Sequence, residues 1–184
     1  MQEPHRDRVT LVLGGARSGK SRFALELASA AFNVTFIATA RAFDEEMRRN
    51  IERHQSERPA HWRTREEPLQ LAEAISSAQS GSEITVVDCL TLFAANLMDA
   101  YGDNRPAIDA SIDELCSALR KSDGKIVLVS NEVGSGIVPE YAAGRQFRDL
   151  LGEMNQRVAA VADNVVLMIA GLPVPIKGRI EGRP

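Results

Sequence analysis

The chain has 184 residues, of which 44% are hydrophobic and 26% charged, and 22 lysine and arginine residues against 25 acidic ones give a net charge of −3. This composition suits one compact domain with a sizeable core and excludes an intrinsically disordered chain. Two other classes of protein are disfavoured, because the acidic balance is poor for binding duplex nucleic acid and no apolar run approaches the roughly 20 residues of a membrane span.

Short apolar runs rich in β-branched residues are predicted to form strands. They cover residues 9–13, 34–38, 84–88, 126–130 and 165–170. Their apolar residues are continuous rather than alternating, which is typical of a parallel sheet that is covered on both faces. We therefore expect an α/β fold with a mostly parallel sheet and helices on both faces.

The segments between these strands have helical patterns, over residues 20–31, 44–56, 68–78, 91–100, 107–121 and 144–162. Two of these predicted helices have clear start signals. Pro68 suits a first helical position, where its missing N–H has no partner to lose. Asp44 can cap a helix whose first turn carries Glu45 and Glu46.

No internal repeat, low-complexity tract or linker divides the chain, so we expect a single domain over residues 1–184. Residues 1–7 are interpreted as an extension, and residues 178–184 as an appended tail because Ile180-Glu181-Gly182-Arg183 looks like an engineered protease site. Cys89 and Cys116 lie in apolar surroundings without CxxC spacing, which predicts reduced, buried thiols. With no apolar signal region at the start, this favours a cytoplasmic protein.

Directly after the first predicted strand stands a full match to the phosphate-loop pattern G-x-x-x-x-G-K-[ST], Gly14-Gly15-Ala16-Arg17-Ser18-Gly19-Lys20-Ser21. Its glycines let successive backbone N–H groups point at phosphate oxygens, and the following helix adds the positive end of its dipole. Lys20 is expected to reach the β- and γ-phosphates, and Ser21 to ligate Mg²⁺. A chance match in a glycine-rich turn is the alternative, which the flanking strand and helix disfavour. The fold is therefore expected to be a P-loop NTPase-type domain with a RecA-like sheet.

Acidic residues follow two other predicted strands, at the edge where open parallel sheets bind ligands. Asp88 ends the run over residues 84–88 and is expected to be the acidic partner for Mg²⁺. Its alternative role is to cap the helix that begins near Thr91. Glu132 follows residues 126–130 and either holds a metal or substrate hydroxyl or belongs to a polar loop; the sequence leaves both open.

Other motifs narrow the class of P-loop protein. A Ras-like GTPase is disfavoured, because Asn131-Glu132-Val133-Gly134 lacks the N-K-x-D guanine clamp and Asp88-Cys89-Leu90-Thr91 is not D-x-x-G. Phosphoryl or nucleotidyl transfer remains. Residues 41–67 hold seven arginines and no lysine, which suits bidentate phosphate binding. A salt-bridged, solvated helix face is the alternative.

Two histidines in this segment are candidate nucleophiles. His54 lies seven residues after Met47 and three after Ile51, so the three would share one helix face. Such a histidine is commonly structural, but a neutral imidazole can also attack phosphorus and hold a nucleotide covalently. His61 is the competing candidate, and His5 is discounted because it lies in a terminus that is expected to fray.

The motifs recur in a fixed order along the chain. After the phosphate loop come Ile37-Ala38-Thr39-Ala40, Asp44-Glu45-Glu46-Met47 ahead of Ile51 and His54, Arg58-Pro59-Ala60-His61-Trp62-Arg63-Thr64, Asp88-Cys89-Leu90-Thr91, Asn131-Glu132-Val133-Gly134 and Gly136-Ile137-Val138-Pro139-Glu140. This set closely resembles the bifunctional adenosylcobinamide kinase/adenosylcobinamide-phosphate guanylyltransferase family of cobalamin biosynthesis. The resemblance covers residues 8–177, including the predicted helix over 147–159.

The resemblance implies roles for individual residues. His54 matches the histidine that becomes covalently guanylylated, and Lys20 is the second catalytic residue. The nucleotide-binding residues implied are Gly14, Gly15, Ala16, Arg17, Ser18, Gly19, Lys20, Ser21, Ala38, Thr39, Ala40, Gln55, Ser56, Glu57, Arg58, Glu66 and Asp88. Ser21 and Asp88 are the expected Mg²⁺ ligands, although the family often has glutamate where Asp88 stands, which leaves the contact of this shorter side chain open.

The resemblance also implies two reactions: ATP or GTP phosphorylates adenosylcobinamide, and GTP then supplies GMP through a guanylyl-histidine to give adenosylcobinamide-GDP. A homo-oligomer, a trimer in particular, is implied as well. Two rival hypotheses stay open, a monofunctional P-loop small-molecule kinase with a structural His54 and a non-catalytic nucleotide-binding subunit. The helix over residues 44–56 is expected to move if His54 is to reach the phosphate loop.

Overall fold

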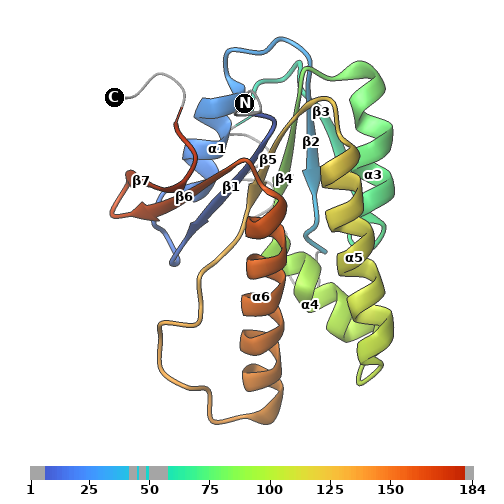
Figure 1. Ribbon diagram of the computed structural model, residues 1–184, viewed down its shortest axis with the longest axis vertical. Helices are drawn as coiled ribbons and strands as arrows, with labels where there is room; N and C mark the ends of the chain where they lie inside the picture. Colours follow the sequence, from blue (N-terminus) through green and yellow to red (C-terminus); the bar gives the residue numbers. More distant parts are fainter. Residues whose placement is uncertain (1–6, 42–44, 46–48, 50–57, 181–184) are drawn as a thin grey trace, which may run out of the picture.

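The structure, a computed structural model, describes residues 7–41, 45, 49 and 58–180. Its centre is a seven-stranded sheet (Figure 1) of β1 (Val9–Gly14), β2 (Val34–Ala38), β3 (Arg63–Glu66), β4 (Ile84–Asp88), β5 (Lys125–Val129), β6 (Asn164–Ile169) and β7 (Leu172–Lys177). The strand order is β3-β2-β4-β5-β1-β6-β7. Neighbouring strands are parallel throughout except for β7, which pairs antiparallel with β6.

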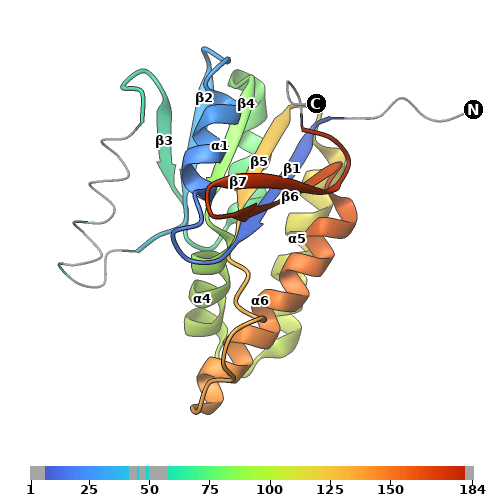
Figure 2. The same ribbon diagram turned by 90° about the vertical axis from the view of Figure 1, so that its left-hand side faces the viewer.

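Helices cover both faces of the sheet, as Figures 1 and 2 show: α1 (Lys20–Ala28), α3 (Leu71–Ala78), α4 (Leu90–Tyr101), α5 (Arg105–Lys121) and α6 (Ala142–Val161). α1 buries Phe23, Ala24 and Ala28 against one face. α3, α4, α5 and α6 pack over the other face around a larger apolar cluster that includes Phe93 and Leu115. This arrangement confirms the predicted α/β class with a mostly parallel sheet.

The five predicted strands are confirmed to within one residue at each end, and their continuous apolar runs are typical of a parallel sheet that is covered on both faces. Two edge strands were not predicted. β3 reads Arg-Thr-Arg-Glu and is mostly exposed, so it lacks the apolar signal of a strand. β7 contains Pro173 and Pro175, which cannot donate to a neighbouring strand and are confined to sheet edges.

The prediction that Pro68 starts a helix is wrong, because α3 begins at Leu71. The carboxylate of Glu67 accepts hydrogen bonds from the backbone N–H groups of Leu69 (3.2 Å) and Gln70 (2.9 Å), and these hold the chain in a turn before the helix. Burial raises the pKa of Glu67, but the bonds from Gln70 and Leu69 outweigh it, and the net pKa lies below its usual value.

The observed ends of the remaining described helices differ from the predicted ends by up to three residues. α1 is shorter than the expected 20–31, and α5 begins at Arg105 because the side chain of Asn104 caps it by accepting from Ala107 N–H. The predicted helix over residues 44–56 lies outside the described residues except for Glu45 and Arg49, both of which are exposed.

The carboxyl ends of the parallel strands meet at one edge of the sheet, from which α4 and the first half of α6 project (Figures 1 and 2). Buried hydrogen bonds hold this edge together. The hydroxyl of Ser130 donates to the side-chain oxygen of Asn155 on α6 (2.7 Å), and the amide nitrogen of Asn155 donates to the carbonyl of Asn131 (3.0 Å). The N–H of Asn131 in turn donates to the Thr91 hydroxyl. Within the described part of the chain, no helix is long and apolar enough to cross a membrane.

Candidate active site at the phosphate loop

The phosphate loop leaves β1 at the carboxyl edge of the sheet and turns into α1. Gly14 has a φ of 152°, and a Cβ atom there would lie 2.6 Å from the carbonyl oxygen of Met168 on the neighbouring strand. Gly19, at the first turn of α1, has a φ of 97°, which is strained for any residue with a side chain. These two glycines are therefore required by the backbone path itself, as the sequence pattern predicts.

Lys20 is buried inside the loop, where its Nζ donates to the carbonyl of Gly15 at 2.6 Å. Burial lowers the pKa of Lys20, and the nearby carboxylate of Asp88 acts in the opposite direction. A cation held in this position is stabilised further when an anion arrives, because the phosphate replaces lost solvation. The side chain is thus placed for phosphate binding.

The Ser18 hydroxyl is a second group in the loop that a bound phosphate would stabilise. Its Oγ is buried and, within the described residues, has no hydrogen-bond partner. A buried hydroxyl without a partner costs about 1–3 kcal/mol, so the site favours a group that can accept or donate there. A phosphate oxygen in the loop would provide that acceptor.

The hairpin of β6 and β7 contacts the phosphate loop through its turn. Ala170 and Gly171, with φ values of 51° and 82°, form the turn between β6 and β7. The N–H of Gly171 donates to the carbonyl of Ser18 at 3.0 Å. The sequence analysis missed this contact, although a Gly between two apolar runs is a hairpin signal.

Asp88 ends β4 beside the loop, half-buried and close enough to Lys20 to affect its pKa. The N-cap position of α4 is Cys89, whose side chain makes no capping bond within the described residues. Burial, followed by the charge of Asp88, raises the pKa of the half-buried Cys89 thiol to about 11, so it stays protonated at neutral pH. Cys116 is buried as expected.

The donors at this edge fit Mg²⁺. Ser21 on α1 and Asp88 offer one hydroxyl and one carboxylate, and Mg²⁺ in nucleotide sites takes one or two protein oxygens, the rest coming from phosphates and water. No group of three or more His, Cys, Asp or Glu side chains that would hold a metal by itself exists within the described residues.

The predicted nucleotide-contacting turn, Ala38-Thr39-Ala40, lies beside Asp88. Thr39 is fully buried, and its hydroxyl both accepts from Cys89 N–H (2.9 Å) and donates to Cys89 C=O (2.7 Å). Its backbone bonds Asp88 and Asn96. Thr39 thus joins the end of β2 to the start of α4 by hydrogen bonds. Among the described residues, no hydrogen bond of this kind is found at the half-buried Ala40.

The nucleotide-binding stretch implied after the histidine is only partly described. His54, Gln55, Ser56 and Glu57 lie outside the described residues. Arg58 places its guanidinium 3.4 Å from the ring centre of Phe36, a cation–π contact on β2. Glu66 is exposed at the end of β3, paired in register with Ala38.

His61 lies at the other end of the sheet. It precedes β3, and its exposed ring stacks on Phe32, just before β2, with ring centres 5.2 Å apart. Since parallel strands carry their amino ends to the edge opposite the phosphate loop, His61 is not placed to attack a nucleotide bound there.

A comparison with known protein families shows which family this chain belongs to. The family described as "Cobinamide kinase / cobinamide phosphate guanyltransferase" matches residues 10–176. The chain belongs to this family.

Relatives within the cobinamide kinase/guanyltransferase family match over nearly their whole length. The bifunctional adenosylcobalamin biosynthesis protein CobP of Pseudomonas aeruginosa is 45% identical over 169 residues, covering 91% of this chain and 96% of the relative. The CobU proteins of Escherichia coli and Salmonella typhimurium are 42% and 44% identical, with 91% of this chain and 98% of each relative covered.

Two solved structures share this fold. An ATPase of the type III secretion system of pathogenic bacteria superposes with a TM-score of 0.58 at 11% identity, covering 92% of this chain and 57% of that chain. The RadB recombinase gives a TM-score of 0.50 at 18% identity, with 88% and 74% covered. At such identity the likeness shows the fold alone, and it agrees with the predicted RecA-like P-loop architecture.

Proposed function

We propose that this chain catalyses two reactions of cobalamin biosynthesis: phosphorylation of adenosylcobinamide by ATP or GTP, and transfer of GMP from GTP to the product, which gives adenosylcobinamide-GDP. The observation that carries the proposal is the phosphate loop of a family member in which Lys20 is buried and the Ser18 hydroxyl has no partner among the described residues. A bound anion would stabilise both of these buried groups.

In the kinase step, the loop amides and Lys20 hold the β- and γ-phosphates while the aminopropanol hydroxyl of the corrinoid attacks the γ-phosphorus. The bond from that phosphorus to the bridging oxygen breaks, and the nucleoside diphosphate leaves. Lys20 spreads the negative charge that develops on these oxygens, a mainly electrostatic and positional form of catalysis. Mg²⁺, held by Ser21 and Asp88, would neutralise phosphate charge when bound.

In the transferase step, an imidazole nitrogen of His54 attacks the α-phosphorus of GTP, and pyrophosphate leaves. A phosphate oxygen of phosphorylated adenosylcobinamide then attacks the same phosphorus, and the bond to histidine breaks. Two displacements replace one difficult transfer, which is the general advantage of nucleophilic catalysis. Support for His54 comes from the family resemblance and from the distant position of His61.

Labelling with [α-³²P]GTP tests the transferase step. We expect an acid-labile, alkali-stable protein label in the wild type and in His61→Ala, and none in His54→Ala. Label that persists in His54→Ala would remove this residue as the nucleophile. Corrinoid phosphorylation with no label in any variant would favour a monofunctional kinase, and neither label nor turnover would favour a nucleotide-binding subunit.

The same proposal includes a homo-oligomer, with three copies as the expected number, and a cytoplasmic location. Exposed apolar side chains of Ile169, Leu172, Val174 and Ile176 around the β6–β7 hairpin support self-association. Light scattering coupled to gel filtration measures the number of copies, and a monomeric mass at micromolar concentration would contradict this part.

A further inference from the structure

A groove of about 520 Å³ opens on the α6 face of the sheet, directly beside the phosphate loop. Leu13, the last residue before the loop glycines, lines its floor, and Glu132 and Gly134 form one wall. The other wall is the α6 surface, with Arg148, Gly152 and Gln156 among its residues. Its volume falls within the roughly 300–1,000 Å³ of small-molecule sites.

Backbone contacts join the groove to the site of chemistry. The N–H of Glu132 donates to the carbonyl of Gly14 at 3.0 Å, and the carboxylate of Glu132 accepts from Gly134 N–H at 2.9 Å. A molecule lying in the groove therefore has one end next to the first glycine of the phosphate loop. Glu132 keeps further acceptor sites on its carboxylate, which a hydroxyl could use.

The groove walls carry polar groups that the fold does not use. Within the described residues, the side chains of Arg148, Asp149 and Gln156 form no hydrogen bond or ion pair. They present a guanidinium, a carboxylate and an amide, which together can donate to and accept from a ligand rich in amides. Asn155 differs, because both ends of its amide are bound to residues 130 and 131.

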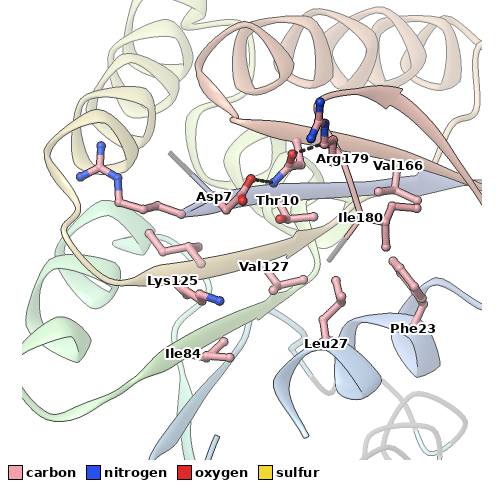
Figure 3. A pocket seen from close by; sticks show the side chains of 13 residues that line it. Asp7, Thr10, Phe23, Leu27, Ile84, Lys125, Val127, Val166, Arg179 and Ile180 are labelled. Carbon is pink, nitrogen blue, oxygen red and sulfur yellow. Dashed lines mark hydrogen bonds between the residues drawn. The ribbon is translucent and has the colours of Figure 1, made fainter. Parts of the chain in front are cut away.

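Two smaller cavities are less suited to an acceptor. The cavity in Figure 3 has about 50 Å³ and lies at the amino ends of the strands, where Asn164 bonds both Asp7 and Arg179 and Ile180 packs over Phe23 and Leu27. A second cavity of about 270 Å³ lies between Met98 on α4, Arg105 at the start of α5 and Leu150 on α6. Neither is lined by Leu13 or Glu132, the two groove residues that adjoin Gly14 of the phosphate loop.

We infer that the groove between α6 and residues 132–134 binds the acceptor, an amide-bearing corrinoid, with its hydroxyl end at Glu132 and the phosphate loop. This inference rests on the proposed function. It adds a binding surface, on the face of the sheet opposite α1, to the nucleotide site.

Gly152 offers a test that leaves the phosphate loop untouched. A Cβ atom at this position meets nothing within 4 Å, so the protein itself has room for a larger side chain. Gly152→Phe fills the groove, whereas Ala110→Phe adds the same ring to an exposed position on α5. The measurements are the KM for adenosylcobinamide, the Kd for the ATP analogue AMP-PNP and the melting temperature.

We expect Gly152→Phe to raise the KM for adenosylcobinamide at least 10-fold while the Kd for AMP-PNP changes less than twofold, and Ala110→Phe to change neither. An unchanged KM in a folded Gly152→Phe, with active wild type, would overturn the groove assignment alone. An inactive wild type with AMP-PNP bound would instead overturn the proposed function.

A milder variant covers the case in which the phenylalanine disturbs folding. Arg148→Ala removes one groove side chain without adding bulk, and Arg120→Ala, exposed on α5, is its control. We expect the KM for adenosylcobinamide to rise about 3- to 10-fold in Arg148→Ala only. Equal KM values in both variants would count against the groove.

Discussion

At the scale of single residues, the phosphate loop contains two buried polar groups that lower the stability of the ligand-free protein. Lys20 is a buried cation, and Ser18 is a buried hydroxyl without a partner in the described structure. Each is unfavourable for the free protein and favourable once an anion fills the loop. The two side chains therefore identify the site more directly than the glycines, which only set the backbone path.

Ser18→Ala should separate these two effects. Removal of the unpartnered hydroxyl is expected to stabilise the ligand-free protein by up to about 1 kcal/mol, because its desolvation is no longer uncompensated. The same change should weaken AMP-PNP binding about 5-fold, since one hydrogen bond to phosphate is lost. Urea unfolding and calorimetric titration measure the two quantities. A variant that is less stable without ligand would show that the hydroxyl already has a partner.

At the scale of elements, the β6–β7 hairpin braces the phosphate loop, and α6 forms a wall beside it. The turn of the hairpin contacts the loop through the backbone bond from Gly171 to Ser18, so the turn must keep its shape for the loop to be held. Ala170 has a φ of 51°, a conformation that costs about 1–2 kcal/mol for a residue with a side chain.

Ala170→Gly is expected to raise the melting temperature by about 2–4 °C, because glycine adopts this φ without strain and the relief of about 1 kcal/mol exceeds its added entropy in the unfolded chain. Ala110→Gly, the same change within α5, should lower it by a similar amount. Differential scanning calorimetry compares the two. Shifts of the same sign would contradict the strain at the turn.

At the scale of the whole molecule, nucleotide binding should stabilise the fold, because a ligand that binds only the native state shifts the unfolding equilibrium. The phosphate loop connects β1 in the middle of the sheet to α1, so both faces depend on it.

AMP-PNP with Mg²⁺ at 100 times its Kd is expected to add about 2.7 kcal/mol, which corresponds to roughly 5–10 °C in melting temperature. In Lys20→Met the shift should fall to near zero at the same concentration, while Lys121→Met, an exposed position at the end of α5, should match the wild type. Thermal shift measurements provide the comparison, and an equal shift in Lys20→Met would exclude Lys20 from phosphate binding.

Local sequence determined much of this protein. The five central strands and the phosphate loop follow from short-range rules, since continuous apolar runs must be covered on both faces and the backbone angles at Gly14 and Gly19 require residues without side chains. The family resemblance depended on the same ordered motifs. Composition and motif were sufficient here because each feature is decided within a few residues of the chain.

Tertiary structure alone decided the rest, because it depends on contacts between distant residues. Pairing with β2 makes a strand of the charged residues Arg63–Glu66, and the carboxylate of Glu67 delays α3 to Leu71. The hydroxyl of Thr39 is bound to Cys89, 50 residues away, and the imidazole of His61 lies at the opposite edge from the phosphate loop. Side-chain partners and sheet edges are properties of the packed chain, which no local pattern encodes.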